Sequence, residues 1–294
     1  MNTREQTLGS FRDKWEQNKE LAFSETLKEG SDIFNWILTR NGVPSSPDFA
    51  AWLKGKTRIL DAGCGNGRVT ALLQRYAPQS ASIVGIDLTA ATVAAENLRG
   101  LQNVDIRQKD LLGDLSDLGL FDLIYCQEVL HHTADPKGAF LNLCQRLAPN
   151  GEIAIYVYKL KAPLREYADD YVQDAISSLP YDEAMKEMRE ITLLGKALSE
   201  LDVKVKVPDV KVLAIEAGEY DVQRFLYHFF LKCFWNPSLS MDENVAINYD
   251  WYHPQLCTRH TADEVLGWFA DAGLSVIHHC VDQYGITVRG VRGS

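Results

Sequence analysis

Apolar and polar positions divide the first half of the chain into short runs that alternate with segments of helical spacing. Apolar runs typical of strands occur at residues 59–60, 82–87, 103–107, 121–126 and 152–158. Apolar residues that recur every three or four positions predict helices at residues 68–76, 90–98 and 136–147. Residues 49–158 are therefore a predicted core domain with an α/β fold and a doubly wound, mostly parallel sheet. Ligands of such sheets bind at the carboxyl ends of the strands.

The segment before this core also shows helical spacing. Its predicted parts are a helical stretch at residues 11–40, a break with a new helix cap at residues 30–32, and a linker at residues 41–48. Residues 1–48 thus form a predicted N-terminal helical lid. Two alternatives stay open for Phe11 and Trp15, which either cover the ligand cleft or pack on the flank of the sheet.

A long insertion follows the fifth predicted strand. Residues 159–250 are too many for a plain loop, so we expect structure of their own. Helices are predicted at residues 163–178, 181–201 and 220–235, and residues 203–215 are either a strand or an extended link. Residues 220–235 are apolar almost all round and must be buried. Four roles stay open for this segment: it lines a substrate pocket, it closes as a lid, it pairs with a second subunit in a homodimer, or it packs in a core.

The last predicted domain, residues 251–294, completes the core. Thr261 and Glu264 have the spacing of a helix capping box. A helix at residues 264–272 is expected next, followed by two strands at residues 274–281 and 285–292.

A glycine-rich turn joins the first predicted strand to its helix. Gly63, Gly65 and Gly67 let the backbone turn tightly and come close to a ligand. The spacing G-x-G-x-G differs from the dinucleotide fingerprint G-x-G-x-x-G. Asp61 stands two positions before the first glycine, where a carboxylate repels a pyrophosphate but suits an ammonium group. S-adenosylmethionine (SAM) carries such a group and no phosphate. A tight turn without a ligand is the alternative.

Further acidic and polar residues fall at predicted strand ends. Asp87 lies about 20 residues after the glycine turn, where an acid reaches ribose hydroxyls. The alternative for Asp87 is a helix cap, but Thr89 is better placed for that cap. Asp110 follows the third strand and is positioned to accept from an adenine amino group, and Gln127 follows the fourth. All of these residues fall at one edge of the predicted sheet, and this shared position carries more weight than any single residue.

Composition narrows the class of protein. The 294 residues carry a formal net charge of -10, which argues against a basic nucleic-acid footprint. The polar first ten residues and the lack of a long apolar run predict no leader and no membrane span. Six scattered cysteines without a C-x-x-C pair favour free thiols in a reducing cytoplasm over disulfides or a metal site.

Taken together, these motifs resemble the class I SAM-dependent methyltransferases, particularly their small-molecule branch. The matching stretches are residues 59–67, 84–87, 109–111, 121–136, 146–157 and 261–292, roughly two thirds of the chain. The resemblance implies a seven-stranded Rossmann-like sheet that ends in an antiparallel hairpin. It also implies SAM as cofactor and S-adenosylhomocysteine as its product.

The resemblance assigns roles by position. It implies a cofactor site formed by Asp61, Gly63, Gly65, Gly67, Asp87, Leu88, Asp110, Leu111 and Gln127. The glycines take the methionine part of SAM, with Asp61 near its amino group, Asp87 at the ribose and Asp110 at the adenine amine. Gln127 borders the methyl group. The acceptor is not identified by these residues.

Candidate acceptor and catalytic residues lie outside this set. Those predicted to contact the acceptor are His131, Tyr158, Tyr249, Trp251 and Tyr252. The aromatic cluster at residues 249–254 is either an acceptor wall, because aromatic faces attract a sulfonium, or an ordinary loop. A hydroxyl acceptor needs a base, for which His132 is favoured over His253. Proximity without a base is an equal alternative. A metal-assisted mechanism through Glu128, Asp135 and these histidines is a further alternative, but no metal spacing supports it.

Three functions compete. The leading one is methylation of a small, partly apolar metabolite at an oxygen, nitrogen or carbon atom. Methylation of RNA or protein is the second, although the acidic charge and the absence of an RNA-binding module count against RNA. The third is a non-catalytic SAM-binding partner.

Overall fold

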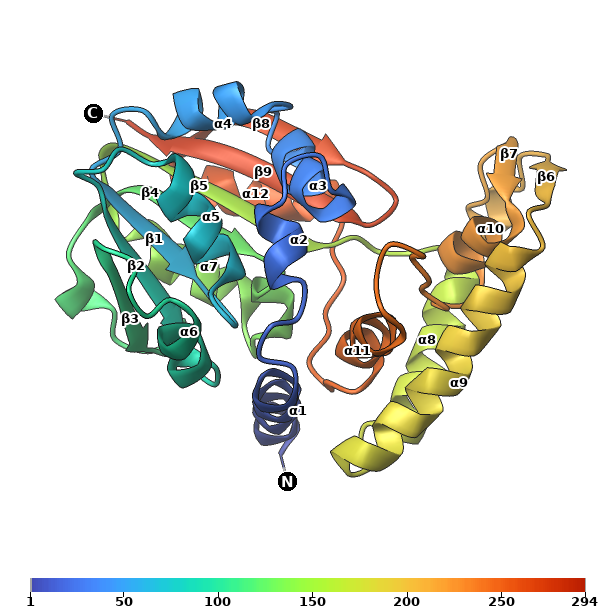
Figure 1. The fold of residues 1–294 in the computed structure, drawn as a ribbon. Helices are drawn as coiled ribbons and strands as arrows, with labels where there is room; N and C mark the ends of the chain where they lie inside the picture. The colour runs from blue at the N-terminus through green and yellow to red at the C-terminus, as the bar shows by residue number, and fades with distance from the viewer. Residues whose placement is uncertain (1, 294) are drawn as a thin grey trace. The chain divides into compact units, whose positions relative to one another are not determined.

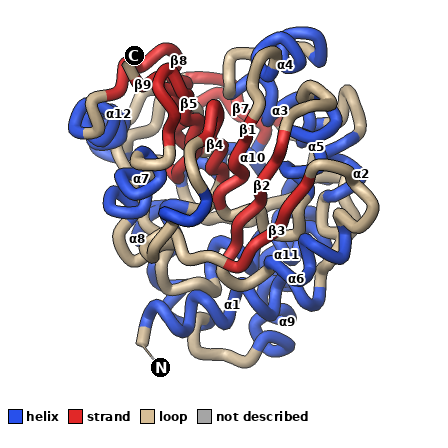
Figure 2. Tube along the Cα trace, turned by 90° about the vertical axis from the view of Figure 1, so that its left-hand side faces the viewer, coloured by secondary structure: helices blue, strands red, loops and turns tan. Residues whose placement is uncertain are grey.

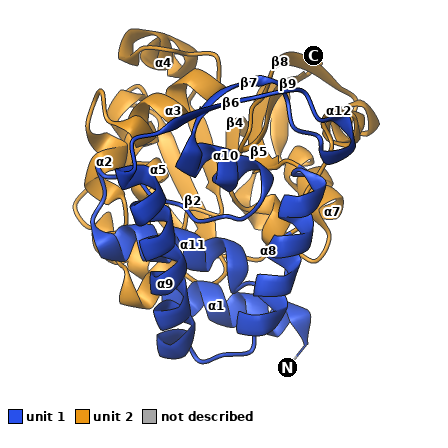
Figure 3. Ribbon diagram, turned by 90° about the vertical axis from the view of Figure 1, so that its right-hand side faces the viewer, with its two compact units in different colours: residues 1–14, 160–257 blue, residues 15–159, 258–294 orange. Residues whose placement is uncertain are grey.

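The computed structural model describes residues 2–293, and the chain divides into two compact units (Figure 3). Unit 1 comprises residues 1–14 and 160–257, and unit 2 comprises residues 15–159 and 258–294. Helix α1 (Thr3–Gln17) begins in unit 1 and ends in unit 2. Unit 1 therefore contains all but one residue of the predicted insertion.

Unit 2 is built on a seven-stranded sheet of order β3-β2-β1-β4-β5-β9-β8 (Figure 2). The strands are β1 (Arg58–Ala62), β2 (Ser82–Asp87), β3 (Val104–Gln108), β4 (Phe121–Gln127), β5 (Leu147–Tyr158), β8 (Leu274–Val281) and β9 (Gly285–Arg292). Strands β1 to β5 pair in parallel, whereas β9 pairs antiparallel with both β5 and β8. The predicted fold class and the final antiparallel hairpin are confirmed.

Helices cover both faces of this sheet (Figure 1). They are α2 (Phe23–Leu27), α3 (Asp32–Arg40), α4 (Ser46–Leu53), α5 (Arg68–Tyr76), α6 (Ala91–Asn97), α7 (Pro136–Cys144) and α12 (Ala262–Asp271), with 3-10 turns at Ser116–Leu118 and Leu130–His132. Ile59 packs with Phe34 and Leu72 on one face, and its neighbour Leu60 packs with Phe140 on the other. Because both faces are buried, the strands read as nearly continuous apolar runs.

Several predicted helix ends in unit 2 are confirmed and some are wrong. Ser31 accepts from the backbone N–H of Phe34 at 3.1 Å and begins α3, as the predicted break requires. Thr261 caps α12, but Glu264 bonds the ring of His260 instead of closing the predicted capping box. The helix predicted to reach Leu147 ends at Cys144, because Leu147 pairs with Phe121 and opens β5.

Unit 1 consists mainly of helices. They are α8 (Pro163–Ile176), α9 (Tyr181–Glu200), α10 (Val222–Phe229) and α11 (Met241–Tyr252), with a hairpin of β6 (Lys204–Val207) and β7 (Gly218–Asp221) and a 3-10 turn at Lys211–Leu213. The predicted helices at residues 163–178 and 181–201 correspond to α8 and α9 and are confirmed.

The apolar helix predicted at residues 220–235 was wrong in length. Its first residues belong to β7, α10 ends at Phe229, and the chain that follows is not helical. Two polar side chains of α10 stabilise this break. Gln223 donates to the carbonyl of Cys233 at 2.7 Å, and Arg224 donates to that of Trp235 at 3.1 Å. These side chains thus satisfy carbonyls of the non-helical segment that follows α10.

Candidate functional site

The glycine turn between β1 and α5 adopts a conformation that only glycine accommodates easily. The backbone φ angles of Gly63, Gly65 and Gly67 are 79°, 54° and 88°. The backbone N–H of Gly63 donates to the carbonyl of Ile86 at 2.7 Å, which ties the turn to the end of β2. A Cβ at Gly63 would lie 2.3 Å from Cγ2 of Val129, so this position has no room for a side chain.

Asp61 is a buried carboxyl group at the end of β1. It is 2% exposed, and its Oδ2 accepts from the Thr70 hydroxyl at 2.6 Å. Burial raises the pKa of Asp61 to about 7, although the Thr70 hydrogen bond and the charge of Arg68 oppose the rise. A cationic group bound beside Asp61 would supply the counter-charge that burial demands.

Asp87 connects the glycine turn to the start of α6. Its Oδ2 accepts from the backbone N–H of Gly65 at 3.0 Å, and its Oδ1 accepts from those of Thr89 and Ala90, both at 2.8 Å. The prediction that Thr89 caps this helix was wrong, because Ala90 is the N-cap residue of α6 and no side chain caps the helix; Asp87 bonds the two backbone N–H groups just before it. Since a carboxylate offers about four acceptor positions, Oδ2 retains capacity for a ligand hydroxyl.

The remaining predicted cofactor residues follow β2 and β3, which are neighbours in the sheet. Gln108 at the end of β3 pairs in register with Asp87 and donates to the carbonyl of Leu88 at 2.8 Å. Asp110 accepts from the backbone N–H of Leu112 at 3.0 Å. Leu111 is buried and packs in the apolar cluster on one face of the sheet. Their carboxyl-terminal positions place them at the same sheet edge as the glycine turn.

The end of α1 and the segment after it cover the glycine turn within unit 2. A Cβ at Gly65 would lie 2.8 Å from Cζ2 of Trp15, so the indole ring rests directly on this glycine. The Asn66 side chain donates to the carbonyls of Lys19 and Leu21 at 3.1 and 3.0 Å. These contacts favour the first of the two alternatives for Trp15, in which it covers the ligand site.

The exit of β4 carries Gln127 in a constrained loop. Glu128 has a φ of 61°, which is unusual for a residue with a side chain. Arg68 holds it through an ion pair of 3.2 Å. The Gln127 amide oxygen accepts from the hydroxyl of Tyr125 on the same strand. Backbone strain of this kind is common beside binding sites.

Two histidines follow this loop and differ in their surroundings. His131 is fully buried and stacks on Tyr158, with ring centres 3.7 Å apart. Its carbonyl accepts from the backbone N–H of Thr258 at 2.8 Å. The His132 ring is half-buried, and its centre lies 5.6 Å from that of Tyr158. The more accessible of the two histidines is therefore His132.

The other predicted acceptor and catalytic residues belong to unit 1 and are buried there. Residues 249–252 form the last turn of α11, so the predicted loop alternative was wrong. Tyr249, Trp251, Tyr252 and His253 are each 5% exposed or less. His253 contacts the Ser10 hydroxyl at 2.8 Å and the Leu179 carbonyl at 2.9 Å through its two ring nitrogens, and burial lowers its pKa. These contacts favour a structural role for His253.

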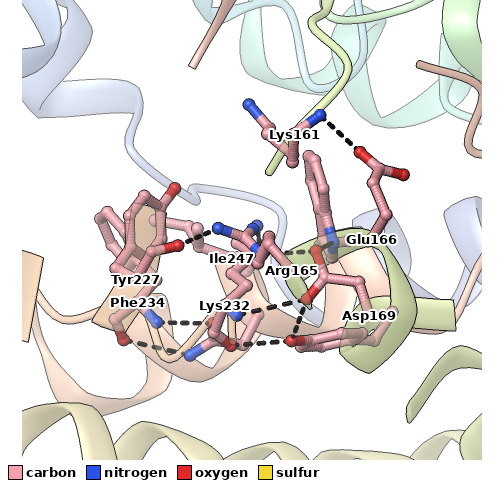
Figure 4. A network of polar contacts seen from close by, with 11 residues as sticks. Lys161, Arg165, Glu166, Asp169, Tyr227, Lys232, Phe234 and Ile247 are labelled. Atoms are coloured by element: carbon pink, nitrogen blue, oxygen red, sulfur yellow. Dashed lines mark hydrogen bonds and ion pairs between the residues drawn. The ribbon is translucent and has the colours of Figure 1, made fainter. Parts of the chain in front are cut away.

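Figure 4 shows a polar network around Arg165, Asp169 and Lys232. Hydrogen bonds to Asp169 explain the positions of Trp251 and Tyr252. The Asp169 carboxylate accepts from the Trp251 indole at 2.7 Å, the Tyr252 hydroxyl at 2.8 Å and the Arg165 guanidinium at 2.5 Å. Lys232 is also buried, which lowers its pKa to about 8, and it donates to a carbonyl of α11 at 2.9 Å. Sequence analysis missed this network, although Arg165 and Asp169 have the i,i+4 spacing of a helical ion pair.

Residues 2–293 contain neither a metal-binding cluster nor a membrane-spanning helix. Between residues 2 and 293, no three His, Cys, Asp or Glu side chains are grouped so that they could hold a metal ion. Glu128 instead pairs with Arg68, and Asp135 accepts from the backbone N–H of Gly138 at the start of α7. Within that range, every helix is too short or too polar to cross a bilayer.

Comparisons with known proteins agree with this arrangement. Residues 53–197 match the family described as "Methyltransferase domain". An uncharacterised Synechococcus protein is 36% identical over 151 residues, which are 49% of this chain and 34% of that protein. The ubiquinone biosynthesis O-methyltransferase of Pseudomonas paraeruginosa is 36% identical over 124 residues, which are 40% of this chain and 47% of that protein. The trans-aconitate 2-methyltransferase of Deinococcus radiodurans is 35% identical over 101 residues, which are 34% of this chain and 37% of that protein.

The chain spans less than half the length of each of these relatives. Among solved structures, the CurJ carbon methyltransferase aligns with a TM-score of 0.51 at 13% identity, covering 96% of this chain and 59% of that one, and it supports the fold alone. Residues 53–197 thus match a methyltransferase domain, and the strand order and the glycine turn of unit 2 agree with the fold of the class I SAM-dependent methyltransferases.

Proposed function

We propose that the protein transfers the methyl group of SAM to a small, partly apolar metabolite. The observation that carries this proposal is the set of polar groups at the carboxyl ends of β1, β2 and β4 in unit 2. Asp61, the glycine turn and Asp87 form one connected arrangement there, with Gly65 hydrogen-bonded to Asp87 at 3.0 Å. The similarity to a ubiquinone biosynthesis O-methyltransferase and to a trans-aconitate 2-methyltransferase supports a small-molecule acceptor.

The donor set is chemically suited to SAM. Burial raises the pKa of the Asp61 carboxyl group in spite of the charge of Arg68, and the ammonium group of SAM would add a further counter-charge. The spare acceptor capacity of Asp87 suits a ribose hydroxyl. In this proposal Gly63, Gly65 and Gly67 contact the methionine part, whereas Leu88, Asp110 and Leu111 surround the adenine. When bound, SAM supplies a methyl group already activated by a positive sulfur.

The chain's own contribution is mainly to orient and to exclude water. Holding an acceptor atom in line with the methyl group supplies much of the rate enhancement. Gln127 borders this position in the proposal, and His131 and Tyr158 form part of the acceptor wall. The chain leaves unit 2 after Lys159, the residue that follows Tyr158, and returns at Thr258.

His132 is the proposed general base for a hydroxyl acceptor. Its half-buried ring is accessible, whereas His131 is fully buried and His253 is engaged at both ring nitrogens. A positioned base contributes about a hundredfold or more to the rate. An amine or carboxylate acceptor would need no such base.

A labelled-methyl assay tests this function. Purified protein, labelled SAM and pools of phenols, amines and carboxylic acids are incubated, and methylated products are identified. With a hydroxyl acceptor, His132→Ala should lower kcat by about a hundredfold and remove the acid limb of the pH profile. His279→Ala, at an exposed position on β8, is the matched control. An unchanged kcat in His132→Ala would refute the base, and product formation in no pool would refute small-molecule methylation.

A further inference from the structure

A small cavity lies inside unit 2, between the end of α3 and the strands β4, β5 and β9. It is lined by Arg40, Asn41, Tyr125, Gln127, Ile155, Tyr156 and Thr287. The empty space between these residues, including open solvent at the mouth, is about 200 Å³, and within all of it there is room for about one water molecule. Gln127 connects this cavity to the strand end that the proposed function places beside the methyl group.

Arg40 is the charged group of this cavity and is only 5% exposed. Its guanidinium carbon lies 3.7 Å from the ring centre of Trp36 and 4.5 Å from that of Tyr156. Stacking of this kind leaves the N–H groups at the edge of the guanidinium plane available. One nitrogen, Nη2, pairs with Asp282 at 2.8 Å. Nε and Nη1 have no hydrogen-bond partner within residues 2–293.

A chain of hydrogen bonds across the cavity wall ends in a further unused donor. The Asn41 amide nitrogen donates to the Tyr125 hydroxyl at 3.1 Å, and that hydroxyl donates to the amide oxygen of Gln127. The Gln127 amide nitrogen and the Asn41 amide oxygen are then left without partners in the described part of the chain. The cavity wall therefore has three buried unmatched donors and one unmatched acceptor.

This imbalance indicates the chemistry of the occupant. Buried donors without acceptors are costly, and a buried guanidinium also favours a negative charge beside it. A water molecule offers two acceptor positions, which is fewer than the three donors. A carboxylate offers about four. The neighbouring Arg289 does not compete, because Glu152 already pairs with it at 2.6 Å.

We propose that this cavity is a carboxylate subsite for the methyl acceptor, with Arg40 and Gln127 as its donors. The acceptor would then be a carboxylic acid, and Arg40 would select it over the corresponding amide or ester. This assignment of the substrate class rests on the proposed methyltransferase function. Asn41 provides the acceptor for a hydroxyl or a water beside the carboxylate.

The test uses the full chain saturated with S-adenosylhomocysteine and formate, the smallest carboxylate, as the probe. The Nε–H signal of Arg40 is followed by NMR of arginine-labelled protein during titrations with formate and with neutral formamide. We expect a saturable shift with formate and none with formamide. Arg40→Lys should weaken formate binding at least about tenfold. Arg107→Lys, exposed on β3, is the control.

A second variant keeps the proposal falsifiable if Arg40→Lys is poorly folded. Gln127→Glu has the same shape and places a carboxylate in the cavity, so it should shift the Arg40 signal without formate and abolish formate binding. If S-adenosylhomocysteine binds and formate leaves the Arg40 signal unchanged, the cavity holds water only and the subsite is refuted. If S-adenosylhomocysteine itself does not bind, the proposed function fails, and the acceptor role of the cavity fails with it.

Discussion

Replacing Asp61 by asparagine should stabilise the ligand-free protein and weaken its binding of SAM. The carboxyl group is 2% exposed and hydrogen-bonded to Thr70, and an asparagine oxygen accepts that bond equally well. The substitution therefore removes a buried charge and keeps the shape. In the proposed function, this same negative charge binds the ammonium group of SAM.

The magnitude follows from the pKa of Asp61, which burial raises from 3.8 to about 7. This change corresponds to a cost of about 4 kcal/mol for the ionised form in the folded protein. Because the folded-state pKa is the higher one, the folded protein binds the proton more tightly, and stability is lost as the pH rises through 7. Between about pH 5.5 and about pH 8, ionisation of Asp61 should lower the unfolding free energy of wild type by about 2 kcal/mol. The unfolding free energy of Asp61→Asn should not show this decrease.

Urea unfolding of both proteins at these two pH values measures the difference. Asp271→Asn, at an exposed carboxylate at the end of α12, controls for the general effect of removing a charge. Titration with S-adenosylhomocysteine at neutral pH should show about ten- to a hundredfold weaker binding in Asp61→Asn, since a hydrogen bond to a charged group is lost. Equal pH dependence of the two unfolding free energies would refute the buried ionised carboxylate. Equal affinity would refute the ammonium contact.

Two other substitutions test separate parts of the structure. Trp15→Ala removes the ring that rests on Gly65, so S-adenosylhomocysteine should dissociate several-fold faster while the unfolding free energy changes little. Stopped-flow fluorescence measures the dissociation rate. An unchanged rate would show that Trp15 does not cover the site. Asp169→Asn leaves Arg165 without its buried counter-charge and should lower the unfolding free energy by about 3–5 kcal/mol. Urea unfolding measures this loss, Asp174→Asn on the same helix is the control, and a loss no larger than the control's would contradict the structural role of the network.

Much of unit 2 could be predicted from the sequence because its signals are local. The strands alternate with helices, and the glycine turn is a continuous motif whose conformation depends on Gly63, Gly65 and Gly67. Strand ends follow directly from strand positions, so Asp61 and Asp87 were assigned to the correct edge. Thr89 was assigned the capping role because of its position, but Asp87 reaches two backbone N–H groups at once.

Unit 1 was harder to predict because its structure depends on contacts between distant residues. The helix predicted at residues 220–235 stops at Phe229, where side chains rather than apolar spacing decide the path of the chain. Trp251 and Tyr252 appeared to be a ligand wall, yet their partner Asp169 lies about 80 residues earlier. Helix α11 had a usable local signal that was overlooked, because Ser240 and Glu243 form a complete capping box.

Arg40 shows the same difficulty in unit 2. Its place at the end of a predicted helix suggests an ordinary basic residue near a helix C-terminus. The cavity it lines also involves β4, β5 and β9, which lie far along the chain. A buried cation with unused donors can be recognised only after the strands are assembled.

Calorimetric titration of the full chain with SAM is the most direct test of the central claim that the carboxyl ends of the strands form a SAM site. Wild type should bind SAM and S-adenosylhomocysteine with about micromolar affinity, which corresponds to about -8 kcal/mol. Asp87→Asn retains an acceptor for the Thr89 and Ala90 N–H groups but lacks the full carboxylate, so it should remain folded and bind far more weakly. Binding in wild type that is lost in this variant would support the account. A folded wild-type protein that binds neither ligand would contradict it.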